Sequence, residues 1–192
     1  DGVNRVYFAG DSNMPVKVGA VKGGKLGDIF ANNLMQRDAQ GRVIIGDDGL
    51  PMAATGDGNL EQYLLDHPIG NIQPDLLMSI TPTFTYKGIS LTAMFDMKFG
   101  GDIVSVSEGM ATSVGTSERT AYRGEYKTVN DVQDWYMVVP GVKADGSVNT
   151  QEVSAQKYYS TIGLYSSQKG YAEEFVHDAS YIKLKELSLG YS

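Results

Sequence analysis

The segment from Ile89 to Phe99 constrains the fold more than any other part of the sequence, because its residues alternate in character. Every second residue from Ile89 is apolar, and the residues between them are polar except Met94. Successive side chains of a β-strand point to opposite faces, so the pattern predicts a strand with one apolar and one polar face. The apolar face lies either against a protein core or against lipid.

A second alternating segment, residues 76–86, precedes the first and predicts the other arm of a hairpin. Lys87 and Gly88 fit a tight turn between the arms, and Pro82 argues against a central strand because it cannot donate to the ladder. Each arm has about eleven residues, which at about 45° tilt span about 25 Å. That is the height of the apolar band of an outer-membrane barrel.

Two further segments carry strand patterns. Residues 178–192 predict a strand, in which a bulge near Lys185–Glu186 brings five apolar residues to one face, namely Ile182, Leu184, Leu187, Leu189 and Tyr191. Near the beginning, Val6–Ala9 predicts a short strand, and residues 16–37 predict a bent strand interrupted by glycines.

The intervening regions are loop-rich. Residues 38–75 are expected to hold a small hairpin around residues 43–45 and a helical turn over Leu60–Leu65, with Asn59 as its N-cap. Residues 100–177 form a long connection with helical potential at Ala155–Tyr159, and Gly100-Gly101 predicts a turn at the strand end. A connection of this length either has structure of its own or is a functional excursion.

Composition narrows the possible functions. The 192 residues include 12 tyrosines and 23 glycines, a composition that favours β-structure. The net charge of −7 argues against nucleic acid as a partner, since phosphate neutralisation needs a basic surface. The chain has no cysteine, and it has no run of about 18 apolar residues that predicts a transmembrane helix.

Several motifs, taken in order, resemble a known family. They are KLGDIFANNLMQRDAQGRVIIGDDGLP, IGNIQPD, the alternating hairpin with YKG at its turn, GGDI, and the closing VHDASYIKLKELSLGYS. This order resembles the C-terminal half of SusC/RagA-type TonB-dependent outer-membrane transporters, over about residues 20–105 and 173–192. The resemblance implies an all-β, antiparallel fold from a large barrel.

The resemblance also implies how the chain contributes to that barrel. Twenty-two strands of about ten residues need roughly 220 residues, so residues 1–192 are expected to be the C-terminal part of a longer polypeptide. They supply about four strands, with extracellular loops near 38–75 and 100–177. The residues expected to face lipid are Ile80, Phe84, Leu91, Phe95 and Met97. The candidates for interfacial aromatic belts are Phe84, Tyr86, Phe99 and Tyr191, and the alternative for each is packing in the interior.

The function implied by the resemblance is import and not catalysis. Such a transporter carries a nutrient, here an oligosaccharide or peptide, across the outer membrane of a Gram-negative bacterium of the Bacteroides kind. Its partners are a SusD-like surface lipoprotein, TonB through an N-terminal region that this sequence does not include, and outer-membrane lipid. No cofactor is implied.

Aromatic residues of the long connection are the candidate ligand-binding residues. Sugar rings pack their C–H faces on aromatic rings, which singles out Trp135 and Tyr136, followed by Tyr158, Tyr159 and Tyr165. The alternative is that these rings pack the loop itself or contact a lid protein.

Two other functions remain open at this point. The hairpin also fits a secreted β-sandwich that binds carbohydrate. Gly10-Asp11-Ser12 is similar to the nucleophile block of GDSL-type esterases, but such a serine needs a histidine base oriented by an acid, and the histidines are His67 and His177. Residues 57–66 include Asp57, Asn59 and Asp66 but lack the ligand spacing of a calcium loop, so no metal site is predicted.

Overall fold

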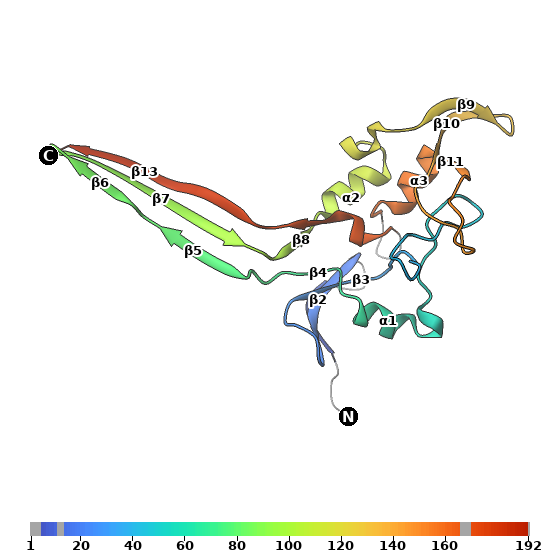
Figure 1. The fold of residues 1–192 in the computed structure, drawn as a ribbon, viewed down its shortest axis with the longest axis horizontal. Helices are drawn as coiled ribbons and strands as arrows, with labels where there is room; N and C mark the ends of the chain where they lie inside the picture. Colours follow the sequence, from blue (N-terminus) through green and yellow to red (C-terminus); the bar gives the residue numbers. More distant parts are fainter. Residues whose placement is uncertain (1–4, 11–13, 166–169, 192) are drawn as a thin grey trace.

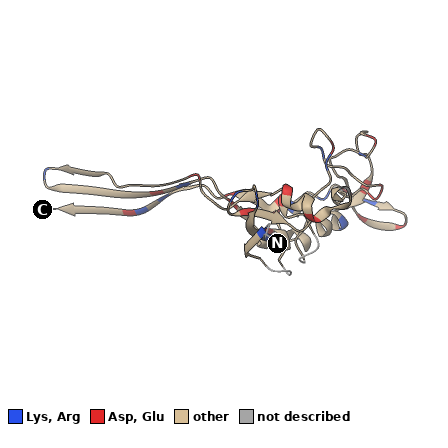
Figure 2. Ribbon diagram, turned by 90° about the horizontal axis from the view of Figure 1, so that it is seen from below, with Lys and Arg blue, Asp and Glu red and all other residues tan. Residues whose placement is uncertain are grey.

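The computed structural model describes residues 5–10, 14–165 and 170–191. Figure 1 shows a body of helices and short strands from which a narrow, twisted sheet projects. Charged residues gather in the body, and the outer part of the sheet carries few of them (Figure 2). Between Leu76 and Phe95 the charged residue is Lys87, which lies in the turn.

The projecting sheet confirms the predicted hairpin of residues 76–99. It consists of β5 (Leu76–Ile80), β6 (Thr83–Tyr86), β7 (Ile89–Phe99) and β13 (Tyr181–Tyr191), with β7 in the centre. Lys87 and Gly88 have φ angles of 47° and 82°, as a tight turn between twisted strands requires. Pro82 lies between β5 and β6, on an outer strand of the described sheet, as its missing N–H predicts.

The predicted bulge in the last strand is also confirmed. The register of β13 against β7 shifts between Leu184, which faces Phe95, and Glu186, which faces Met94. Residues directly opposite each other in an antiparallel pair share a face. The five apolar residues of β13 named above therefore lie on the Phe95 face of the sheet.

The prediction of one bent strand over residues 16–37 is wrong. The structure has two antiparallel strands there, β2 (Val16–Val21) and β3 (Asp28–Ala31), within a sheet that also contains β1 (Arg5–Ala9) and β4 (Gly70–Asn71). Gly23, Gly24 and Gly27 lie in the turn between these strands. Gly23 has φ 89°, and the Gly27 N–H donates to the carbonyl oxygen of Gly19 in β2 at 2.9 Å. Glycines with positive φ angles reverse the direction of the chain here, whereas the sequence predicts only a bend within one strand.

The body contains short helices and two small sheets. Its helices are η1 (Gly56–Gly58), α1 (Leu60–Asp66), α2 (Val106–Ser113), η2 (Glu118–Ala121), α3 (Ala155–Ile162) and η3 (Ala172–Phe175). Its strands are β8 (Asp102–Val104) paired with β12 (Val176–Asp178), and β9 (Glu125–Val129), β10 (Val132–Val138) and β11 (Glu152–Ser154), with β10 in the centre. None of the helices within the described ranges is long and apolar enough to cross a membrane.

The two predicted helical segments are confirmed, with longer bounds. Asn59 caps α1, because its side chain accepts a hydrogen bond from the Gln62 N–H at 3.2 Å. Ser154 caps α3 in the same way by accepting from the Lys157 N–H at 3.2 Å. The expected small hairpin around residues 43–45 is present as isolated antiparallel bridges, Arg37 with Val43 and Ile45 with Pro51, with turns at Gly41 and Gly49 and no continuous strand.

The core of the body joins the two regions that were expected to be separate loops. Phe175, which is fully buried, packs in one cluster with Leu34 and Ala54. Met35 packs with Met137 and residues of α3. A third cluster brings residues 45 and 50 against β11 and Val139, the residue that follows β10. Residues 38–75 and 100–177 thus form a single packed body, and the long connection has structure of its own.

All pairs of named strands are antiparallel, and β-structure dominates the chain. Among the described residues the projecting sheet is open, because β13 and the β5–β6 arm each pair with β7 alone.

Candidate functional site

One face of the projecting sheet is apolar over its whole length. The strand register places on it the alternating residues of β7, their partners from the β5–β6 arm, and the five apolar residues of β13. Phe84 is 68% exposed and Leu189 is 75% exposed, and Figure 1 shows no other described helix or strand over this part of the sheet. A contiguous exposed apolar surface of this kind marks contact with a membrane or another protein.

The structure brings the predicted lipid-facing residues together on this face. Ile80 lies directly opposite Phe95, and Phe84 lies opposite Leu91. Met97 shares their face, since it pairs with Met78 and Ile182.

The four candidate belt aromatics lie at the two ends of the apolar face. Phe84, Tyr86 and Tyr191 lie at the turn end, where Ile89 pairs with both tyrosines. Phe99 lies at the body end, opposite Leu76. Aromatic rings at both ends of an apolar band are typical of strands that cross a bilayer.

The opposite face carries a hydrogen-bonded polar ladder. The Ser79 hydroxyl donates to the Asp96 carboxylate at 2.9 Å, and the Lys185 ammonium lies 2.9 Å from the same carboxylate. Nearer the turn, the Thr83 and Thr92 hydroxyl oxygens lie 3.0 Å apart. The two faces of one sheet therefore have environments of opposite polarity.

A short network joins this sheet to the body. The Ser180 hydroxyl accepts from the Gly100 N–H at 2.8 Å and donates to the Asp178 carboxylate at 2.6 Å. The hydrogen bonds from Ser180 hold the pKa of Asp178 below its ordinary value. Gly100 and Gly101 have φ angles of 74° and 81°, which confirms the predicted turn at the strand end.

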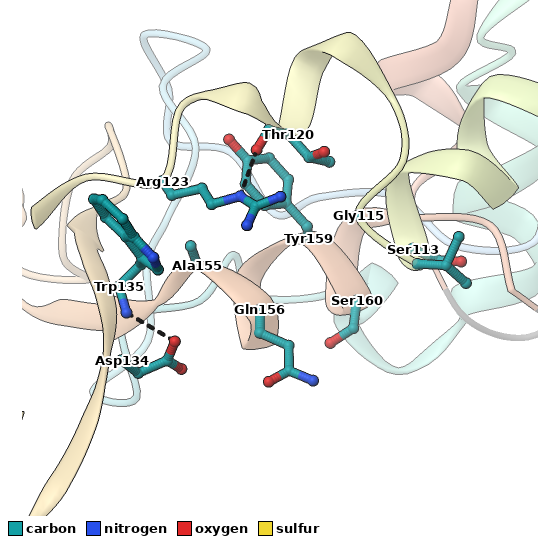
Figure 3. Close-up of a pocket in the computed structure, with 11 residues that line it drawn as sticks. Ser113, Gly115, Thr120, Arg123, Asp134, Trp135, Ala155, Gln156, Tyr159 and Ser160 are labelled. Atoms are coloured by element: carbon teal, nitrogen blue, oxygen red, sulfur yellow. Dashed lines mark hydrogen bonds between the residues drawn. The ribbon is translucent and has the colours of Figure 1, made fainter. Parts of the chain in front are cut away.

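A pocket of about 360 Å³ opens in the body beside Trp135 (Figure 3). The end of α2, η2, β10 and the first turns of α3 surround it. The polar and aromatic side chains that line it are Ser113, Thr120, Arg123, Asp134, Trp135, Gln156, Tyr159 and Ser160.

Of the five aromatic candidates, the structure brings Trp135 and Tyr159 to this pocket. The Trp135 side of β10 also carries Tyr126 across the strand pair, with the two rings 5.3 Å apart. Tyr159 is buried, and its hydroxyl donates to the Tyr122 carbonyl oxygen at 2.5 Å. Burial raises the pKa of Tyr159.

The other three aromatic candidates lie elsewhere. Tyr136 points to the face of β10 opposite Trp135, and Tyr158 packs against the buried core. Tyr165 is 71% exposed and lines a neighbouring pocket of about 560 Å³. The aromatic residues therefore do not form one platform.

Sequence reasoning did not find Arg123, Asp134 and Gln156, which line the same pocket as Trp135. Arg123 Nε donates to the Thr120 carbonyl oxygen at 3.2 Å, and the Asp134 carboxylate accepts from the Trp135 N–H at 2.7 Å. The turn between β9 and β10, Asn130-Asp131, has φ angles of 48° and 62°. A hairpin signal at Asn130-Asp131 is the local pattern that points to this region.

The residues that would serve an esterase or a calcium site have other surroundings or lie outside the described ranges. Ser12 lies outside the described residues, and His177 Nε2 lies 2.7 Å from a Glu108 carboxylate oxygen. Asn59 is used as a helix cap, and the Asp66 carboxylate accepts from the Gln62 amide at 2.7 Å. Within the described ranges, no group of three or more His, Asp or Glu side chains is arranged to hold a metal ion.

Comparisons with known proteins add no relative. No family model matches this chain, and no curated protein matches its sequence. A functional assignment therefore rests on the geometry of the sheet and the pocket, together with the sequence motifs quoted above.

Proposed function

We propose that this chain forms part of the wall and the outer loops of a TonB-dependent outer-membrane transporter of the SusC/RagA kind, which imports an oligosaccharide. The observation that carries the proposal is the apolar face of the projecting sheet, which continues across three adjacent strand positions and is exposed. In this proposal the face is in contact with lipid, as the outward faces of strands in an outer-membrane barrel are.

The length of the sheet supports this environment. The central strand β7 has 11 residues, and β13 has the same number. At a rise of about 3.3 Å per residue, such a strand is about 36 Å long, and tilted by about 45° it spans about 25 Å of bilayer. This matches the apolar band of an outer-membrane barrel.

The edges of the sheet support a barrel wall as well. In the described structure, β13 and the β5–β6 arm each have one edge without a strand partner. Unpaired backbone groups are costly in lipid, and closure into a barrel removes both edges. In this proposal, further strands of the same polypeptide pair with both edges.

The two ends of the sheet differ, and this difference supports one orientation of the sheet across the outer membrane. A two-residue turn at Lys87-Gly88 closes one end, and the whole body lies at the other end (Figure 1). Outer-membrane barrels have short periplasmic turns and long outer loops. The body therefore faces the outside in this proposal, where it contacts the nutrient and a SusD-like lipoprotein, whereas TonB acts from the periplasmic side.

A cysteine-labelling experiment tests the environment of the sheet, and the 192 residues contain no cysteine that would compete for the label. Phe84→Cys and Leu91→Cys place thiols on the apolar face, and Thr85→Cys and Thr92→Cys place matched thiols on the polar face. In native outer membranes, a charged maleimide is expected to label the second pair and a lipid-soluble maleimide the first pair.

The contrary outcome is equally specific. Equal labelling of both faces by the charged reagent contradicts a wall in contact with lipid. If the chain also remained monomeric in buffer without detergent, a secreted β-sandwich that binds carbohydrate would explain the data better.

A further inference from the structure

The pocket beside Trp135 contains an arginine whose charge no carboxylate of the described residues neutralises. The other arginines of the chain form ion pairs with Asp or Glu, and they are Arg5, Arg37, Arg42 and Arg119. Arg123 donates from Nε to the Thr120 carbonyl oxygen, and within the described ranges its terminal amino groups have no protein acceptor. A guanidinium stays charged and presents these groups as a planar fork that fits a carboxylate.

The acidic residue of the pocket, Asp134, does not bind the Arg123 guanidinium. The Asp134 carboxylate accepts from the Trp135 N–H, and no ion pair joins it to Arg123 in the part of the chain that the structure describes. Its neighbour across the strands, Lys127, pairs with Glu125 and Glu152 instead. Figure 3 shows the Arg123 guanidinium and the Asp134 carboxylate apart. The pocket thus has a cationic side and a separate acceptor side.

The remaining lining residues suit a ring with several hydroxyl groups. Trp135 is 41% exposed, which leaves indole surface available for stacking. The amide of Gln156 makes no hydrogen bond to another described residue, and the Ser160 hydroxyl donates to the Lys157 carbonyl oxygen, so that its lone pairs remain free. An apolar ring face beside a few polar groups is the arrangement that orients small polar ligands.

We propose that this pocket binds an acidic oligosaccharide of the hexuronate class. The ligand carboxylate binds the Arg123 fork, the C–H face of the sugar ring packs on the Trp135 indole, and ring hydroxyls bond to Asp134 and Gln156. The volume of about 360 Å³ accommodates a short saccharide segment. The inference rests on the proposed role of the body in nutrient contact, and it specifies the class of nutrient.

The pocket has a built-in reporter, because Trp135 is the single tryptophan of these 192 residues. The full chain in detergent is titrated with trigalacturonate and with the methyl ester of trigalacturonate, which has the same rings without the charges, while tryptophan fluorescence is recorded. The acid is expected to bind at least about tenfold more tightly than the ester, because hydrogen bonds to a charged group are the stronger ones.

Substitutions of Arg123 test whether this side chain causes the tighter binding of the acid. Arg123→Gln is expected to abolish the difference in affinity between acid and ester. Arg123→Lys keeps the charge but loses the fork, so part of the preference is expected to remain. Arg42→Gln is the matched control, because Arg42 is exposed, pairs with Asp38 and lies outside the pocket.

Several outcomes overturn the inference. These are equal affinity for acid and ester, no binding of either, or a preference that survives Arg123→Gln. Binding of triglutamate as tightly as trigalacturonate would replace the saccharide by an acidic peptide. If Arg123→Gln does not fold, as judged by circular dichroism, the comparison of acid and ester on the parent chain decides. The cysteine-labelling pattern does not depend on Arg123, so an intact pattern with no acid preference refutes this inference alone.

Discussion

The ammonium group of Lys185 lies 2.9 Å from the Asp96 carboxylate, and this ion pair marks the place where β13 changes register against β7. Lys185 is the extra residue of the bulge, because Leu184 and Glu186 face consecutive residues of β7. The bulge absorbs one residue and leaves Leu184 and Leu187 on the same face. The apolar face of the sheet therefore continues past an irregularity in its own pattern.

Two single-residue deletions in β13 are expected to differ strongly in how much they impair assembly. Deleting Lys185 removes the bulge and keeps the register on both sides of it, so the loss is limited to an exposed ion pair that solvent screens. Deleting Ser188 either turns Leu189 and Tyr191 to the polar face or turns Glu186 to the apolar face. The measurement is the fraction of protein that becomes protease-resistant in lipid vesicles, and similar fractions for the two deletions would contradict this register.

Neighbouring substitutions in the centre of β7 are expected to differ in the same assay. Phe95→Arg places a charge on the apolar face and should cost about 2–4 kcal/mol of folding free energy in the bilayer. Asp96→Asn removes the ion pair with Lys185 on the hydrated face and should have a much smaller effect, because solvent screens this pair. Urea titration in vesicles measures both values, and equal tolerance of the two changes would refute the assignment of faces.

Two phenylalanines test the independence of the body and the sheet. Phe175→Ala removes a fully buried ring from the body core and should cost about 3–5 kcal/mol. Phe84→Ala, on the exposed face of the sheet, should change the stability of the body by less than about 0.5 kcal/mol. Urea unfolding of the body in detergent, followed by Trp135 fluorescence, distinguishes them. A large effect of Phe84→Ala in this assay would show that the sheet and the body unfold together.

Alkaline pH is expected to destabilise the body through its buried tyrosines. Burial, followed by the charges of Glu173 and Asp48, raises the pKa of Tyr171 above its ordinary value of 10.0. The phenol then ionises first in the unfolded chain, so its contribution to stability is complete below about pH 10 and is lost as the pH rises through the higher folded pKa. The free energy of unfolding, measured with urea from about pH 8 to pH 11, should fall at the alkaline end.

Tyr171→Phe separates this titration from the other tyrosines. The variant loses the hydrogen bond from the Tyr171 hydroxyl to the Pro51 carbonyl oxygen, 3.0 Å long and buried, which should cost about 1–3 kcal/mol near neutral pH. Its alkaline slope should be smaller than that of the parent, although Tyr158 and Tyr159, whose pKa values burial also raises, still contribute. An unchanged slope would show that Tyr171 does not titrate with unfolding.

Local patterns in the sequence were sufficient for the elements that depend on near neighbours. The alternation of residues 76–99, the turn at Lys87-Gly88, the bulge near Lys185 and the N-cap at Asn59 all appear in the structure. Each depends on side-chain periodicity or on one special backbone position, and both are readable from a few consecutive residues. The same reading mistook residues 16–37 for one strand, because glycines serve equally in a bend and in a turn.

The candidate pocket could not be predicted from local sequence patterns. Trp135 was recognisable as an aromatic residue, but its neighbours Arg123 and Gln156 come from segments that carry no shared motif. Their proximity follows from the packing of α3 against β10 and of Met35 against both. Contacts between residues so far apart depend on the arrangement of the whole body, which no short pattern encodes.

The sequence by itself determined a two-faced ribbon, because alternation with a period of two assigns every side chain of a strand to one face or the other. Only the tertiary structure decided that this ribbon stays uncovered by the body and that residues 38–75 and 100–177 pack together as that body. It also decided that, among the described residues, no carboxylate pairs with Arg123, whereas the other arginines form ion pairs. The physical reason is that periodicity is a local property, whereas burial and charge pairing depend on which distant residues meet.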